Sequence, residues 1–230
     1  MPETPCSKCN DVGYITTEKD GMKVFVSFCD CQTGQLLRKT GWTKKLEEAE
    51  ILKAYHDFHF ENFQVQSMCP SHVAFARDLE YYLQNIQKKH DEGKVWLICG
   101  TTGVGKTLGA SLILKEALKK DFTARYILWT DLIDKVFNEE DLVDKLREVD
   151  FLVIDGLGHD KISKTTNSRF VEDLLEKVVK YRFGNKVPTI LISSIDPREL
   201  QRRFPVLISL LSPAQISLVE GVSIIHKPLK

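Results

Sequence analysis

The sequence has no net charge, since 32 Lys and Arg residues balance 32 Asp and Glu residues. A protein without a global field does not attract nucleic acid over its whole surface, so any such contact must come from a local patch. Long apolar runs are also missing, and stretches such as VWLIC and TILI are far too short to cross a bilayer. The N-terminus, MPETPCSKCND, lacks the apolar core of a signal peptide. We therefore expect a cytoplasmic protein with reduced thiols and no membrane contact.

Cysteine is sparse, yet four of the six cysteines lie near the front, as Cys6-x-x-Cys9 and Cys29-x-Cys31. The segment between the pairs alternates apolar and polar residues around a Lys-Asp-Gly turn, which predicts a β-hairpin. A hairpin brings its two ends together, so both pairs come within reach of one tetrahedral Zn²⁺ ion. Four thiolates leave no open position, so we expect a structural zinc site. Four free thiols are the alternative interpretation, and a disulfide is disfavoured in the cytoplasm.

The strongest motif is GTTGVGKT, residues 100–107, which matches the phosphate-binding pattern G-x-x-x-x-G-K-[ST] in full. An apolar strand, VWLIC, precedes it and an apolar helical segment follows, which is the context that such a loop requires. The backbone N–H groups of the loop and the helix N-terminus favour bound phosphate. We expect Lys106 to reach the β- and γ-phosphates of ATP and Thr107 to ligate Mg²⁺. The predicted nucleotide-binding residues are Gly100, Thr101, Thr102, Gly103, Val104, Gly105, Lys106, Thr107 and Leu108.

Further apolar strands alternate with helical segments after this loop. The predicted strands cover residues 123–130, 151–155, 188–194 and 216–225. Alternation of this kind predicts an α/β fold with a parallel sheet covered by helices on both faces. Ligands bind at the carboxyl ends of such strands, so Asp155 should lie near Thr107 and hold Mg²⁺ through water.

We expect three parts: a zinc module at 1–40, a helical linker at 41–58 and an ATP-binding domain at 59–230. The linker is predicted to be a helical connector interrupted near Gly41, because glycine weakens a helix interior. A helix is predicted from about Ser71 to Lys89, where apolar residues recur at helical spacing.

At the strand FLVIDGLG, a second carboxylate is missing, because Gly156 follows Asp155. Hydrolysis needs a group that orients the attacking water, and losing such a base typically costs about 10²–10⁴ in rate. Asp160 and Asp196 are possible substitutes, but nothing in the sequence places either within reach. We therefore expect a switch that binds ATP and hydrolyses it slowly or conditionally.

The chain resembles the AAA+ ATPases of the DnaC/DnaI helicase-loader family, with IstB-type transposition helpers as relatives. The resemblance rests on FENF at 60–63, GTTGVGKT, VIDGLG, and LISS followed by REL. It implies that the cysteine module grips a replicative DNA helicase while the ATPase domain senses nucleotide and single-stranded DNA. It also implies that Phe60 and Phe63 line the adenine side of the pocket, and that no C-terminal lid is present.

Other features of the pattern are altered or undecided. Ile195 stands where the family often has a sensor asparagine, leaving Ser193, Ser194 and Asp196 as nearby polar groups. Arg202 or Arg203 is either an arginine finger acting across a nucleotide-linked homo-oligomer or part of a solvated basic face.

Contacts with DNA have several candidates. Lys161 and Lys164 follow Asp155 in the chain, and Tyr126 and Trp129 are aromatic groups able to stack on bases. For the two aromatic residues, core packing is the favoured interpretation.

Two other functions compete with a helicase loader. One is a transposition or recombination helper ATPase that binds duplex DNA, and the other is a nucleotide-binding adaptor without catalysis. The cysteine module favours the loader over the transposition helper, which usually lacks one, and Gly156 favours the adaptor without excluding the loader.

Overall fold

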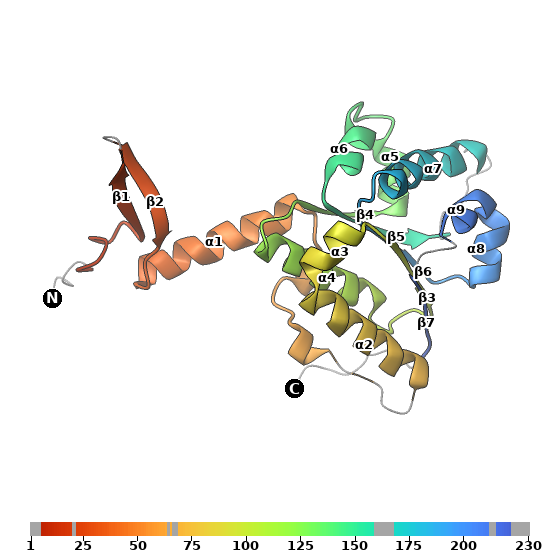
Figure 1. Cartoon of the computed structure of the whole chain (residues 1–230), viewed down its shortest axis with the longest axis horizontal. Coiled ribbons are helices and arrows are strands. Elements are labelled where there is room, and N and C mark those ends of the chain that lie inside the picture. Colours follow the sequence, from red (N-terminus) through yellow and green to blue (C-terminus); the bar gives the residue numbers. More distant parts are fainter. Residues whose placement is uncertain are drawn as a thin grey trace. The chain divides into compact units, whose positions relative to one another are not determined.

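The structure, a computed structural model, describes residues 6–19, 22–63, 65, 69–158, 168–211 and 215–221. The chain forms two compact units, residues 1–48 and 49–230. Figure 1 shows a two-stranded hairpin in the first unit and the large sheet in the second. Across the described ranges, no helix combines the length and the hydrophobicity that crossing a membrane would need.

The first unit is a hairpin followed by a long helix. Strands β1 (Tyr14–Lys19) and β2 (Met22–Phe28) pair antiparallel, as predicted, and the expected turn lies outside the described residues. Helix α1 (Gln32–Glu48) runs without interruption through Gly41, so the predicted break in the connector is wrong. Gly41 is exposed, and its helical cost of about 1 kcal/mol is small for a helix of 17 residues. Gly34 packs against the backbone of Cys29, where an added Cβ would overlap the carbonyl oxygen.

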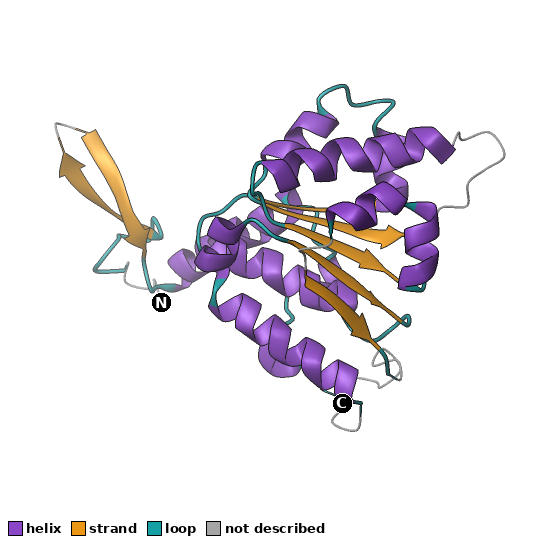
Figure 2. Cartoon of the chain, turned by 45° about the vertical axis from the view of Figure 1, so that its right-hand side comes forward, coloured by secondary structure: helices purple, strands orange, loops and turns teal. Residues whose placement is uncertain are grey.

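The second unit contains a five-stranded parallel sheet in the order β4-β5-β6-β3-β7. The strands are β3 (Val95–Gly100), β4 (Ala124–Leu128), β5 (Phe151–Leu157), β6 (Thr189–Ser193) and β7 (Gln215–Val219). Buried apolar side chains dominate β3, β4, β5 and β6, as expected when both faces of a sheet are covered, whereas Ile216 and Leu218 of the edge strand β7 are exposed. Figure 2 shows helices on both sides of these strands, so the predicted fold class is confirmed.

Helices α2 (Pro70–Gln84), α3 (Ile86–Glu92) and α4 (Lys106–Lys119) lie on one face of the sheet. The other face carries α5 (Trp129–Lys135), α6 (Leu142–Glu148), α7 (Ser168–Gly184), α8 (Pro197–Arg203) and α9 (Pro205–Leu210). Two short 3₁₀ turns, η1 (Lys53–Tyr55) and η2 (Phe60–Asn62), precede α2.

Element boundaries differ from the predictions at several places, including β5, which runs to Leu157 instead of ending at Asp155. The single helix predicted from Ser71 to Lys89 is two helices, because Asn85 leaves helical geometry and its side chain donates to the carbonyl oxygen of Tyr81. Strand β4 ends at Leu128, and Trp129 begins α5 instead of ending the strand. The last strand ends at Val219, short of the predicted end. Apolar residues suit both strands and buried helices, so local composition does not fix these limits.

Arg182 secures the edge of the sheet where the strands begin. Its side chain is fully buried, and its guanidinium donates to Thr189 Oγ1 at 2.9 Å and to the carbonyl oxygens of Leu146 at 2.9 Å and Val149 at 2.6 Å. It also donates to the carbonyl oxygen of Asp150. Burial lowers the pKa of Arg182 to about 9, yet the group stays charged at neutral pH. One side chain therefore ties α6, α7, β5 and β6 together.

We predict that Arg182→Met lowers the free energy of unfolding by about 3–5 kcal/mol, because it leaves buried carbonyl groups without donors. Urea denaturation measures this change. Arg77→Met is the matched control, since the Arg77 side chain is 78% exposed and lies 3.8 Å from Asp78; its effect should stay within about 0.5 kcal/mol. Equal effects of the two variants would show that Arg182 has no such role.

Candidate nucleotide and metal sites

The phosphate loop at 100–107 joins β3 to α4 at the carboxyl edge of the sheet. Gly100 lies so close to β7 that an added Cβ would overlap the carbonyl oxygen of Val219. Gly105 has a φ of 90°, a conformation that favours glycine, and α4 begins directly after it at Lys106. The N-terminus of a 14-residue helix therefore stands at the end of the loop, which is the arrangement that binds phosphate groups.

Three side chains with predicted roles meet at this edge. The Lys106 ammonium group is buried and donates to the carbonyl oxygens of Gly100 at 2.8 Å and Thr101 at 2.7 Å. Burial lowers the pKa of Lys106, and the nearby Asp155 carboxylate opposes that shift. The Thr107 hydroxyl donates to Asp155 Oδ2 at 2.7 Å. A hydroxyl and a carboxylate in contact are the hard oxygen ligands that Mg²⁺ prefers, so this pair fits the predicted magnesium site.

Tyr126 belongs to the same cluster, although the sequence favoured core packing over base stacking for it. Its side chain is 2% exposed, and its hydroxyl donates to Asp155 Oδ2 at 2.9 Å. Trp129, by contrast, is fully buried and packs edge-on against Phe204, as the core interpretation predicted. The role of Tyr126 could have been inferred from its place on β4, diagonally across from Asp155 on β5.

A stack of rings leads from η2 to the phosphate loop. Phe60 and Phe63 stack with ring centroids 6.1 Å apart, and Phe63 stacks on His72 at 5.7 Å. His72 is fully buried, and its Nε2 lies 3.1 Å from the carbonyl oxygen of Val104 in the loop. The two phenylalanines predicted on the adenine side are therefore linked to the loop through His72. Sequence spacing had placed His72 only in the apolar stripe of its helix.

Position 156, where a second carboxylate was expected, has an unusual backbone. Gly156 has a φ of 83°, and the pairing of β5 with β6 shifts register between Ile154 and Leu157. An added Cβ at Gly156 would meet no heavy atom within 4 Å. Glycine therefore stands at a bulge in β5. Both the backbone conformation and the side chain at position 156 differ from those expected for a carboxylate on a regular strand.

The polar groups expected after β6 have structural partners. The Ser193 hydroxyl is buried and donates to the carbonyl oxygen of Leu157 at 2.8 Å. Asp196 accepts from the backbone N–H of Arg198 at 2.8 Å and caps α8. Ser194 is half-buried at the end of β6. Asp160, Lys161 and Lys164 lie outside the described residues.

The two candidate arginine fingers differ in their surroundings. Arg203 donates to the carbonyl oxygen of Gly158, just after β5, and its guanidinium lies 5.6 Å from the ring centroid of Phe204. The Arg202 side chain is 76% exposed and lies 3.1 Å from Glu199. Arg203 is therefore held inside the unit, while Arg202 extends from its surface.

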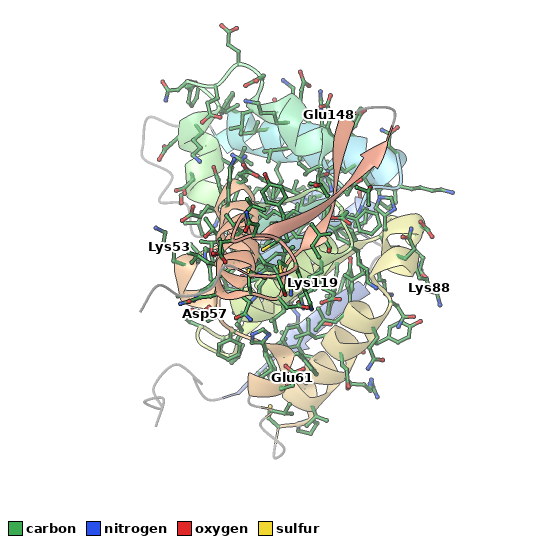
Figure 3. All side chains as sticks on the ribbon, turned by 90° about the vertical axis from the view of Figure 1, so that its left-hand side faces the viewer. Lys53, Asp57, Glu61, Lys88, Lys119 and Glu148 are labelled. Carbon is green, nitrogen blue, oxygen red and sulfur yellow. The ribbon has the colours of Figure 1, made fainter. Side chains whose placement is uncertain are left out.

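Charges of both signs are interspersed on the face shown in Figure 3. The labelled side chains are Lys53, Asp57, Glu61, Lys88, Lys119 and Glu148, all of them exposed. Three are positive and three are negative, so these residues provide no surplus of positive charge for nucleic-acid phosphates.

The four cysteines near the hairpin form a separate cluster in the first unit. Their Sγ atoms all lie within 4.8 Å of one another, with Cys6 and Cys29 at 3.7 Å and Cys9 and Cys31 at 3.5 Å. A tetrahedron of thiolates around Zn²⁺ has edges of about 3.8 Å, given Zn–S distances of about 2.3 Å. The donor set and its spacing therefore fit zinc. Hydrogen bonds from the backbone lower the pKa of Cys6 to about 7, whereas burial raises the pKa of Cys9 to about 12.

The sheet order, the glycine-rich loop and the Thr107–Asp155 contact define a P-loop nucleotide-binding protein with an AAA+-type fold. The chain belongs to the family described as novel STAND NTPase 3, whose sequence model matches residues 81–197, about half of the chain.

Comparison with individual proteins extends this assignment. The chain is 21% identical over 147 residues to the replicative helicase loader DnaI of Bacillus subtilis strain 168, covering 61% of this chain and 46% of DnaI. It is 23% identical over 162 residues to the replicative helicase loader DnaC of Escherichia coli K12, covering 66% of this chain and 61% of DnaC. Each match thus spans less than two thirds of the relative.

A crystal structure of the DnaC helicase loader superposes with a TM-score of 0.63 at 19% identity. The superposition covers 73% of this chain and 99% of that one. At this identity the likeness concerns the fold. The resemblance to loader-type AAA+ proteins that the motifs predicted is confirmed.

We predict that the purified protein carries one Zn²⁺ per chain, measured by metal analysis after dialysis. The double variant Cys6→Ser, Cys9→Ser should lose it, because a serine hydroxyl is a poor zinc ligand. Cys69→Ser is the control, since Cys69 lies outside the cluster. Zinc retained by the double variant would rule out the four-thiolate site.

We also predict that Gly156→Glu does not raise ATP turnover, because the strand is bulged at this point and φ is positive. Gly156→Ala should lower the free energy of unfolding by about 1 kcal/mol or more, and Gly156→Asn by less, because asparagine tolerates positive φ. Thermal denaturation and a phosphate-release assay measure the two effects. A marked gain of turnover in Gly156→Glu would show that the missing acid alone limits hydrolysis.

Proposed function

We propose that this protein is an ATP-binding helicase loader. In this proposal it docks on a replicative DNA helicase through the cysteine module, and ATP binding drives placement of the helicase on single-stranded DNA. The observation that carries the proposal is the phosphate loop with Thr107 in contact with Asp155. Similarity to DnaI and DnaC supports the role in replication.

The proposed residue roles follow from the chemistry of the cluster. Backbone N–H groups of the loop bind the β- and γ-phosphates, and Lys106 adds a positive charge beside them. Thr107 ligates Mg²⁺, and Asp155 holds it through water. Phe60 and Phe63 line the adenine side of the pocket, where Phe60 stacks on Phe63 and Phe63 stacks on His72. Leu108 is buried in the first turn of α4.

Slow or conditional hydrolysis is part of the proposal. Gly156 brings no carboxylate to orient water, and Asp196 is engaged in capping α8. The described residues of the site suit nucleotide and metal binding, and among them we identify no base for hydrolysis. Binding and release of ATP then supply the switch, with turnover depending on a partner.

Of the two arginines, we propose Arg202 as the one that acts on a neighbouring subunit. Its side chain extends from the surface, whereas Arg203 is bound to the Gly158 carbonyl group of its own chain. An arginine finger stabilises the charge on a transferring phosphoryl group across an interface, and so requires an exposed guanidinium.

A nucleotide-binding adaptor without catalysis is the second candidate, and the bulge at Gly156 favours it. The adaptor and the loader differ in whether the helicase and single-stranded DNA stimulate turnover. A transposition helper is less well supported, because the four-cysteine cluster has no role in it.

We predict that the protein alone hydrolyses ATP at least about 100-fold more slowly than the ~10 s⁻¹ typical of enzymes. Single-stranded DNA together with a hexameric replicative helicase should raise the rate. Lys106→Ala serves as the control, because it removes ATP binding itself. Robust turnover without any partner would contradict the proposal, and absence of stimulation would favour the adaptor.

Co-purification with the helicase tests the docking role. Association should persist in Lys106→Ala and be lost in Cys6→Ser, Cys9→Ser. If the cysteine variant still binds the helicase normally, the module is not the docking element.

A further inference from the structure

The Asp155 carboxylate receives two hydrogen bonds on the same oxygen. Thr107 Oγ1 donates to Oδ2 at 2.7 Å and the Tyr126 hydroxyl donates to Oδ2 at 2.9 Å. Thr107 comes from the first turn of α4, and Tyr126 comes from the neighbouring strand β4. Two donors from different elements therefore fix the orientation of one carboxylate. Because both bonds end on Oδ2, neither of them occupies Oδ1.

Tyr126 reaches this carboxylate because of the strand register. Val153 pairs with Tyr126 across β4 and β5, and Asp155 pairs with Leu128. Tyr126 is thus the diagonal neighbour of Asp155, a separation that only a long side chain bridges. A shorter hydroxyl residue at the same position would not reach.

The Tyr126 side chain is shielded from solvent. It is 2% exposed, so water has little access to its hydrogen bond with Asp155. A buried donor held in one position is a rigid support for a carboxylate.

We propose that Tyr126 is a positioning residue for the magnesium of this site. Its hydroxyl holds the Asp155 carboxylate by Oδ2, so that Oδ1 accepts from a water molecule bound to Mg²⁺. The inference rests on the proposed ATP–Mg²⁺ binding and adds the residue that orients the metal-side carboxylate. Groups that orient metal ligands in this way typically contribute about 10–100-fold to metal affinity.

The test compares Tyr126→Phe with Tyr82→Phe. Each variant removes one buried hydroxyl, and Tyr82 stacks on Trp96 away from the carboxylate. Affinity for a fluorescent ATP analogue is measured in EDTA and over a range of Mg²⁺ concentrations. In EDTA, the affinity of Tyr126→Phe for the ATP analogue should stay within about 2-fold of the wild-type value. The Mg²⁺ concentration that gives half of the maximal gain in affinity should rise by about 10-fold. Tyr82→Phe should change neither value.

A double-variant cycle with Asp155→Asn separates positioning from other effects. If Tyr126 acts through the carboxylate, adding Tyr126→Phe to Asp155→Asn changes the Mg²⁺ requirement by less than about 2-fold. A 10-fold change in that background overturns the inference, as does an unchanged Mg²⁺ requirement in Tyr126→Phe alone. Wild-type protein that binds no ATP with Mg²⁺ overturns the proposed function itself.

Discussion

The hydrogen bond between the Thr107 hydroxyl and the Asp155 carboxylate is the contact on which the candidate nucleotide site depends. It joins the start of α4 to the end of β5, although β6 lies between β5 and the strand that leads into the phosphate loop. The strand order brings a loop residue and a carboxylate 48 positions later into contact. Parallel pairing places the carboxyl ends of the strands at the same edge of the sheet, which is where ligands bind in open α/β sheets.

The buried polar groups at the two edges of the sheet have different roles. At the carboxyl edge, buried polar groups such as Lys106 and Tyr126 surround the place where phosphate and metal are expected. At the opposite edge, Arg182 satisfies backbone carbonyl groups and joins helices to strands. A hairpin and one helix bury little apolar surface, so a metal would add to the stability of the cysteine unit. The four-cysteine cluster and the candidate nucleotide site therefore belong to separate units of the chain.

The bulge at Gly156 affects how the site would work. A carboxylate at this position would project from a backbone that turns away from regular strand geometry, so its loss is not a simple truncation of a side chain. Ser193 and Arg203 donate to the carbonyl groups of Leu157 and Gly158, which directly follow the bulge, and stabilise this path. Among the described residues, groups suited to phosphate and metal are present at this site and no base is identified, which is consistent with the proposed slow hydrolysis.

The sequence by itself determined the alternation of strands and helices, the phosphate loop, the hairpin and the four-cysteine spacing. These features depend on residues close together in the chain, where periodicity and turn chemistry act. Tertiary structure alone decided that α1 passes through Gly41, that Trp129 starts a helix, and that Arg203 is bound within its own chain. It also decided that Tyr126 supports Asp155 and that His72 contacts the loop. Such pairings depend on strand register and on the face a side chain occupies, because partners far apart in sequence meet only once the sheet has formed.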